Sequence, residues 1–158
     1  MTEDDRDAVE RMLAAHGTAT IATSGGAGPW AAAVFYAHDA DLNLYFVSDQ
    51  RTRHARDMAK SPAVAAAIHA DCSSWSEVRG VQLSGQVQAL SGAQREAALH
   101  CYLTKFPQIK ALFEAPGSDQ ERLIAERLRV ASLYRLRPVW IRLIDNRAGF
   151  GHKRELRL

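Results

Sequence analysis

The segment Ser48-Asp49-Gln50-Arg51-Thr52-Arg53-His54 carries the most chemically specific side chains of this sequence. It leaves an apolar run and opens a helix-like one, and it offers hydroxyl, guanidinium and imidazole groups. The start of a helix presents free N–H groups and a partial positive charge, so anions are favoured there. Arginine adds a forked donor that matches phosphate oxygens. Two interpretations of these residues stay open: a phosphate site, or a solvated charged loop in which Thr52 only caps the helix.

Other patterns that resemble active sites lack the context that their chemistry needs. The segment Gly26-Ala27-Gly28-Pro29-Trp30-Ala31 matches the letters of a dinucleotide-binding loop, but a strand-like aromatic run follows it instead of a helix. We therefore predict a turn there. Ser73 and Ser74 lack the glycine-flanked elbow of a nucleophilic serine. The six histidines show no metal-binding spacing, so we predict no metal site, and no residue is assigned as catalytic.

Three consecutive alanines, Ala31 to Ala33, interrupt the apolar run from Trp30 to Tyr36. Alanines cannot fill a core by themselves, so a bulky group is expected to lie against them. A planar cofactor would satisfy this requirement. A large side chain from a neighbouring helix would satisfy it as well, and that is the commoner arrangement.

The elements that would position these residues begin with a helix over 2–16, in which Thr2 and Asp5 have the spacing of a capping box. A second helix, over 52–60, carries the cationic segment. Short strands with short connections favour antiparallel pairing. These strands are expected at 18–23, 30–37, 42–48, 63–70 and 78–90. Gly85, in the middle of the last strand, predicts a bulge or bend.

The third quarter of the chain is predicted to be helical. Ser91 with Gln94 has capping-box spacing and opens a helix that runs to Phe106-Pro107, and Ser118 with Glu121 repeats the pattern. Strands follow at 133–136, 139–144 and within 149–158. Strands gathered first, with helices inserted late, predict an α+β domain. We expect one domain over 1–158, with a helical insertion at about 91–131.

Composition excludes several classes of protein. A chain of 158 residues with 47% hydrophobic and 24% charged residues fits one globular domain. A net charge of +2 does not suit a protein that must neutralise many phosphates, so no nucleic-acid partner is expected. The acidic N-terminus lacks the features of a signal peptide, and no apolar run approaches the roughly 20 residues that span a bilayer. With two cysteines that we expect to be reduced, these features predict a cytoplasmic protein without a membrane partner.

Several segments together resemble the FMN-binding split barrels of the pyridoxamine 5'-phosphate oxidase-like superfamily. Leu44–Ser48, Arg51–Ala55 and Ser61-Pro62 look like the strand, phosphate loop and helix of that family, and Val78–Gly85 looks like its next long strand. Further segments are similar to the bacterial YhbP-like branch. These are Trp30–Tyr36, Thr52–His54, Arg79–Gln82, Phe106-Pro107, Trp140–Leu143 and Gly149–Lys153. The resemblance extends in order from about residue 18 to residue 153.

The resemblance implies a six-stranded antiparallel Greek-key split β-barrel with peripheral helices, the barrel spanning about 18–90 and 132–155. It also implies a homodimer that holds FMN in clefts at its interface. In the oxidase a Ser-Arg-Lys triplet binds the flavin phosphate, and Thr52, Arg53 and His54 match it here. The remaining cofactor-binding residues implied are the neighbouring cation Arg51, the strand end Val47 and Ser48, the ring-bordering strand residues Ala32, Ala33, Val34 and Phe35, and the donors Arg79 and Lys153 from the partner subunit.

The function implied is that of an FMN-dependent oxidoreductase acting on an unidentified small molecule. The oxidase carries basic residues in the ring-bordering strand where this chain has alanine, so oxidation of pyridoxamine phosphate itself is not expected. Two alternatives stay open. The protein is a non-catalytic dimer that binds FMN or haem, or it is a split-barrel scaffold without a cofactor. The absorbance spectrum of the purified protein distinguishes them.

Overall fold

The computed structural model of the protein describes residues 3–158, so the capping role expected of Thr2 lies outside the described residues. Five of the seven strands come before residue 90, three consecutive helices follow and two more strands come after them, an order expected of an α+β chain. The helices are α1 (Glu3–Ala15), α2 (Arg53–Lys60), α3 (Gly92–Lys105), α4 (Pro107–Glu114) and α5 (Asp119–Val130). The strands are β1 (Thr18–Gly25), β2 (Gly28–His38), β3 (Leu44–Ser48), β4 (Ala63–His69), β5 (Arg79–Ala89), β6 (Ser132–Asp145) and β7 (Lys153–Arg157).

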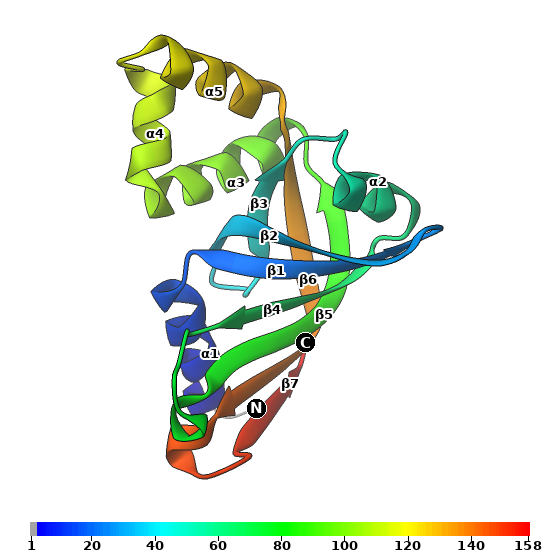
Figure 1. Ribbon diagram of the computed structural model, residues 1–158, viewed down its shortest axis with the longest axis vertical. Coiled ribbons are helices and arrows are strands. Elements are labelled where there is room, and N and C mark those ends of the chain that lie inside the picture. Colours follow the sequence, from blue (N-terminus) through cyan, green and yellow to red (C-terminus); the bar gives the residue numbers. More distant parts are fainter. Residues whose placement is uncertain (1–2) are drawn as a thin grey trace.

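Six antiparallel strands close into a barrel in the order β3-β2-β1-β4-β5-β6, and β6 returns to pair with β3. This order is that of a Greek key, since β4 lies beside β1 after a connection that carries α2 (Figure 1). The predicted barrel is therefore confirmed, with β7 as an added seventh strand. On the edge of β6 that faces away from β5, residues 132–136 pair with β3 and residues 140–144 pair with β7. The two halves of one strand edge thus have different partners.

Large apolar side chains fill the barrel, and α1 and α2 cover its two ends (Figure 1). Strand alternation sends every second residue inward, which places Ile21, Tyr36 and Phe46 in the interior. The Phe46 ring stacks on Tyr134 with 5.3 Å between ring centroids. The Tyr36 hydroxyl donates to the Leu13 carbonyl of α1 at 2.8 Å, which satisfies a polar group that would otherwise be buried without a partner.

The glycine-rich loop is the tight turn of a hairpin, as predicted. Gly25 pairs with Gly28, so Gly26 and Ala27 alone connect β1 to β2. Gly28 has a φ of +87°, a conformation that side chains with a Cβ rarely adopt. Because two antiparallel strands flank the loop, it does not present a helix N-terminus to a pyrophosphate.

The bulge predicted at Gly85 is confirmed, and it changes the strands that follow. The pairing of β5 with β6 shifts between Ser84 and Gly85, so Ser84 lies opposite Trp140 while Gly85 lies opposite Pro138. Proline lacks the N–H that a regular ladder needs, and a bulge accommodates it. The two strands predicted at 133–136 and 139–144 are therefore one continuous strand, β6.

The helical segment differs from the prediction at two points. Phe106 ends α3, but Pro107 then opens α4, a helix that we did not predict. Proline suits the first position of a helix because that position needs no N–H donor. Ser91 precedes α3 without a side-chain capping bond, whereas Ser118 accepts from the Glu121 N–H as expected. Within residues 3–158, none of the helices combines the length and apolar character needed to cross a bilayer.

Candidate functional site

Three of the predicted phosphate-binding side chains meet where β3 ends and α2 begins. The Ser48 Oγ lies 2.6 Å from the His54 Nε2 and 3.2 Å from the Thr52 Oγ1. The Thr52 Oγ1 lies 3.3 Å from the same histidine nitrogen. Ser48 is buried, and burial lowers the pKa of His54 although the charge of Asp57 opposes the shift. His54 is therefore neutral at pH 7, and it offers one donor and one acceptor rather than a positive charge.

The N-terminus of α2 presents backbone donors beside this cluster. Thr52 is the N-cap: its Oγ1 accepts from the Ala55 N–H at 3.3 Å and donates to the Asp49 carbonyl at 2.8 Å. The N–H groups of Arg53 and His54 have no partner among the described residues. Unpaired N–H groups and the helix dipole together favour an anion at this point.

The Arg53 side chain joins α2 to the β1–β2 hairpin. Its Nη2 donates to the Ala27 carbonyl at 3.0 Å and to the Gly28 carbonyl at 3.2 Å. Its guanidinium lies 4.6 Å from the centroid of the Trp30 ring. The Nε is buried without a hydrogen-bond partner in the described chain, and only an ion pair at 3.7 Å links it to Asp57. Arg53 is thus held in place with donor capacity left over.

Sequence reasoning missed Asp57, the buried carboxylate behind this arginine. Its Oδ2 accepts from the Thr23 hydroxyl at 3.2 Å as well as facing Arg53. Gly25 leaves the space that it occupies, because a Cβ on Gly25 would lie 2.0 Å from the Asp57 Oδ1. No spacing in the sequence signals this contact, since α2 and the hairpin meet only in the folded barrel.

Arg51, also predicted to bind phosphate, is paired with its own loop. Its guanidinium makes three hydrogen bonds to the Asp49 carboxylate, with Nη2 at 2.6 Å from Oδ2, and its side chain is 86% exposed. These bonds hold the pKa of Asp49 at about 2. Arg51 therefore lies on the rim, whereas Arg53 lies at the centre of the contacts.

The alanine-rich strand β2 points its residues alternately inward and outward. Val34 is buried in the barrel and Ala32 is half-buried on the same side, while Ala33 and Phe35 face outward and are exposed. Ala33 lies opposite Thr20 of β1, which in turn lies opposite Ala67 of β4. The outer surface over these strands is consequently lined by small side chains and lies close to the backbone.

Val47, the remaining strand-end residue predicted, is covered by α3. It packs against a cluster formed by Ala37, Tyr102 and Phe106. Phe106 also contacts the exposed Phe35 edge-to-face, with ring centroids 5.4 Å apart. A helix side chain therefore does lie against β2, as one interpretation of the alanines required, but it does so at Ala37 and Phe35 and not at Ala33.

Arg79 and Lys153 lie at the other end of the barrel. Arg79 opens β5 and lines a cavity with Ala8 and Met12 of α1, and Lys153 pairs with Ile144 at the start of β7 (Figure 1). Since α1 and α2 cover opposite ends, one chain does not bring these residues to the α2 cluster. They can join it only from a second subunit.

Comparisons with known proteins agree with this architecture. The family model described as "Pyridoxamine 5'-phosphate oxidase" matches residues 5–132. The chain is 29% identical over 151 residues to UPF0306 protein YhbP of Salmonella paratyphi A, covering 95% of this chain and 91% of that protein.

Two solved structures share the fold at low identity. A haem-binding protein from Mycobacterium smegmatis matches with a TM-score of 0.72 and 20% identity, over 99% of this chain and 60% of that one. HutZ, the haem storage protein from Vibrio cholerae, matches with a TM-score of 0.59 and 15% identity, over 84% of this chain and 88% of that one.

Proposed function

Because the chain belongs to the pyridoxamine 5'-phosphate oxidase family, we propose that it binds FMN and acts as an oxidoreductase on a small molecule. The observation that carries the proposal is the group of donors at the start of α2, beside a strand whose outward side chains are small. A flavin mononucleotide needs an anchor for its phosphate and a flat slot for its ring, and the residues at this end of the barrel support both requirements.

Residues already in position at the start of α2 support the phosphate requirement. The free N–H groups of Arg53 and His54 would donate to the phosphate, and the guanidinium of Arg53 would neutralise part of its charge. The Ser48 hydroxyl and the neutral His54 ring share one hydrogen bond and leave one further donor between them, whereas the Thr52 hydroxyl already donates to the Asp49 carbonyl. The buried Nε of Arg53, which lacks a hydrogen-bond partner in the described chain, supports an anion nearby.

The ring requirement fits the outer face of β2. The exposed Ala33 has no side chain beyond Cβ, so a flat ring could lie against the strand backbone there. Phe35 and Phe106 would form an apolar wall at one end of the slot and exclude water from it. FMN, when bound, supplies one- and two-electron transfer, while the protein binds and orients it. The two cysteines, Cys72 and Cys101, are unpaired, which suits the reducing cytoplasm that we propose as its compartment.

We further propose a homodimer, in which Arg79 and Lys153 of the partner subunit would complete the slot. Exposed small residues on neighbouring strands allow two barrels to approach closely: they are Thr20, Ala22, Ala33 and Ala65. Light scattering at micromolar concentration is expected to give twice the mass of one chain. A stable monomer under those conditions would overturn the dimer proposal.

Replacing Arg53 by alanine is expected to weaken FMN binding by about 1.5–3 kcal/mol, or roughly 10- to 150-fold, because a charge-assisted bond is lost. Arg51→Ala is the matched control, since Arg51 is exposed and bound to Asp49. It should change the affinity less than about threefold, as expected of an exposed ion pair. Quenching of flavin fluorescence measures both affinities. Equal losses in the two variants would contradict the assignment of Arg53 as the anchor.

The absorbance spectrum of the protein purified without added cofactor tests the proposed function itself. Flavin bands that persist through gel filtration support it. Reduction of the bound flavin by NADH or NADPH would add evidence of redox activity. A Soret band would indicate that the protein binds haem instead of FMN, as the names of two structural relatives state for those proteins. A colourless protein that does not quench added FMN would leave only the scaffold alternative.

A further inference from the structure

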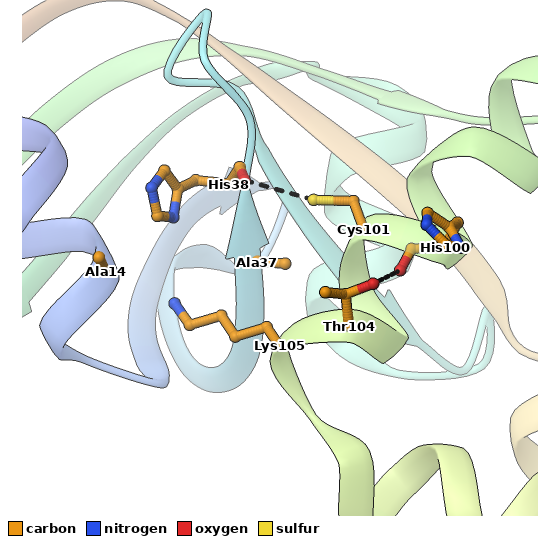
Figure 2. Close-up of a pocket in the computed structure, with 7 residues that line it drawn as sticks. All are labelled: Ala14, Ala37, His38, His100, Cys101, Thr104 and Lys105. Atoms are coloured by element: carbon orange, nitrogen blue, oxygen red, sulfur yellow. Dashed lines mark hydrogen bonds between the residues drawn. The ribbon is translucent and has the colours of Figure 1, made fainter.

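A second cavity lies away from the α2 cluster, between α1, the end of β2 and α3 (Figure 2). Its volume is about 400 Å³, which is within the range of small-molecule sites. Seven residues line it: Ala14, Ala37, His38, His100, Cys101, Thr104 and Lys105. His38 and Lys105 both extend toward α1 in Figure 2, whereas the Cys101 thiol points back to β2.

Lys105 brings a positive charge that no carboxylate balances within ion-pair distance in the described chain. Its Nζ donates to the Leu13 carbonyl at 2.9 Å and to the His16 carbonyl at 2.7 Å, and it lies 4.1 Å from the centroid of the Tyr36 ring. These contacts fix the position of the ammonium group. Burial lowers the pKa of Lys105 to about 8, so the group is still mainly charged at pH 7.

His38 contributes a ring nitrogen that makes no hydrogen bond within the described residues. Its Nδ1 is buried and has no hydrogen-bond partner in the described part of the chain. Burial and the charge of Lys105 lower the pKa of His38, against the opposing charges of Glu10 and Asp39. The neutral ring carries one N–H and one acceptor nitrogen. A buried polar group without a partner is costly, so a ligand that supplies one is favoured.

Two other polar groups of the lining, the Cys101 thiol and the Thr104 hydroxyl, are already engaged. The Cys101 thiol donates to the His38 carbonyl at 3.3 Å, and the Thr104 hydroxyl donates to the His100 carbonyl at 2.8 Å. Both bonds are drawn in Figure 2. The methyl groups of Ala14 and Ala37 and the aliphatic stem of Lys105 make up the rest of the wall. The lining therefore combines one ammonium group, from Lys105, with the imidazole rings of His38 and the exposed His100, beside an apolar wall.

We propose that this cavity binds a small monocarboxylate with an apolar body. The carboxylate would balance the Lys105 charge and accept from the His38 ring, and the apolar body would fill the space against Ala14 and Ala37. A phosphate dianion fits less well, because Lys105 is the single ammonium group of the lining and would face two negative charges. The proposal does not depend on FMN binding, since α2 and its donors lie at the other end of the barrel.

Titration of the ¹⁵N-labelled protein with hexanoate tests the proposal. Amide signals of residues 37–38 and 101–105 are expected to shift with a Kd of about 1 mM or tighter, as suits a ligand of this size. Hexanamide, which has the same shape without the charge, should bind at least about tenfold more weakly. Equal affinity for the two probes, or no shift at 20-fold excess over that Kd, would overturn the proposal.

Substitutions at the cavity wall locate the site. Lys105→Met would remove the Lys105 bonds to the Leu13 and His16 carbonyls and disturb the fold. Ala14→Leu is the better change, because it fills the cavity from an exposed helix position. We expect it to reduce hexanoate affinity at least about tenfold through steric exclusion. Ala15→Leu on the same helix is the control and should leave affinity unchanged. His38→Phe should also weaken binding while the melting temperature stays within a few degrees. Unchanged binding in Ala14→Leu would place the ligand elsewhere and overturn the assignment.

Discussion

Gly85→Ala is expected to destabilise the protein by about 3 kcal/mol or more, at the upper end of the effects of overpacking. A Cβ at this position would lie 2.2 Å from the Arg137 carbonyl oxygen, 2.8 Å from the carbonyl carbon and 2.9 Å from the Pro138 Cα. All three atoms belong to the backbone of β6, so no side chain can rotate away to relieve the contact. The strain falls at the bulge where β5 pairs with β6.

Chemical denaturation followed by circular dichroism measures this loss. Gly26→Ala is the matched control, since a Cβ on Gly26 would have no atom within 4 Å and its φ is not positive. We expect the free energy of unfolding of that variant to lie within about 0.5 kcal/mol of the parent value, as is usual for an open surface position. If Gly85→Ala were as stable as Gly26→Ala, the conclusion that the β6 backbone leaves no space for a Cβ at position 85 would be wrong.

Ala33→Leu is expected to abolish FMN retention while the stability of the protein without cofactor stays almost unchanged. Ala33 faces outward and is exposed, so a larger side chain there would extend away from the barrel interior and occupy the proposed ring slot. Ala32→Leu should behave in the opposite way. Ala32 points toward the barrel interior, and overpacking there should cost about 1–3 kcal/mol with or without cofactor.

Flavin content after purification and the melting temperature without cofactor are the two measurements. Full FMN binding in both variants would show that β2 does not border the cofactor. Unfolding of both would show that the two alanines only pack the barrel. The sequence left open which alanine faces outward, and the register of β2 against β1 decides it: Ala33 lies opposite the exposed Thr20, while Ala32 lies opposite the buried Ile21.

The strands and their pairing could be predicted because their signals are local. The Gly26-Ala27 turn, the bulge at Gly85 and the cap at Thr52 each depend on a residue's own backbone preferences. α4 was missed because Phe106-Pro107 is equally compatible with the end of one helix and the start of the next. β6 was predicted as two strands because Pro138 interrupts the pattern. The proline fits because the pairing skips Val139 of β6, opposite Ser84 and Gly85.

The candidate site could be predicted only where its residues are close in sequence. The connection from β3 to α2 is short and carries Ser48, Thr52 and His54. Their side chains are therefore brought together by the loop itself. Asp57 was missed because its role depends on the space left by Gly25 on the hairpin. The cavity around His38 and Lys105 combines three elements distant along the chain, and none of its residues has a recognisable spacing.

The pairing of one edge of β6 with both β3 and β7 also affects how the chain folds during translation. Residues 132–136 close the ring by pairing with β3, and that contact joins positions 44–48 to a segment near the end of the chain. The hairpins β1–β2 and β4–β5 need only nearby residues and can form during synthesis. Ring closure, with its high contact order, must wait until β6 has been translated. Until then the edges of β3 and β5 are unpaired and open to other chains, so a nascent chain stalled before residue 132 is most exposed to aggregation.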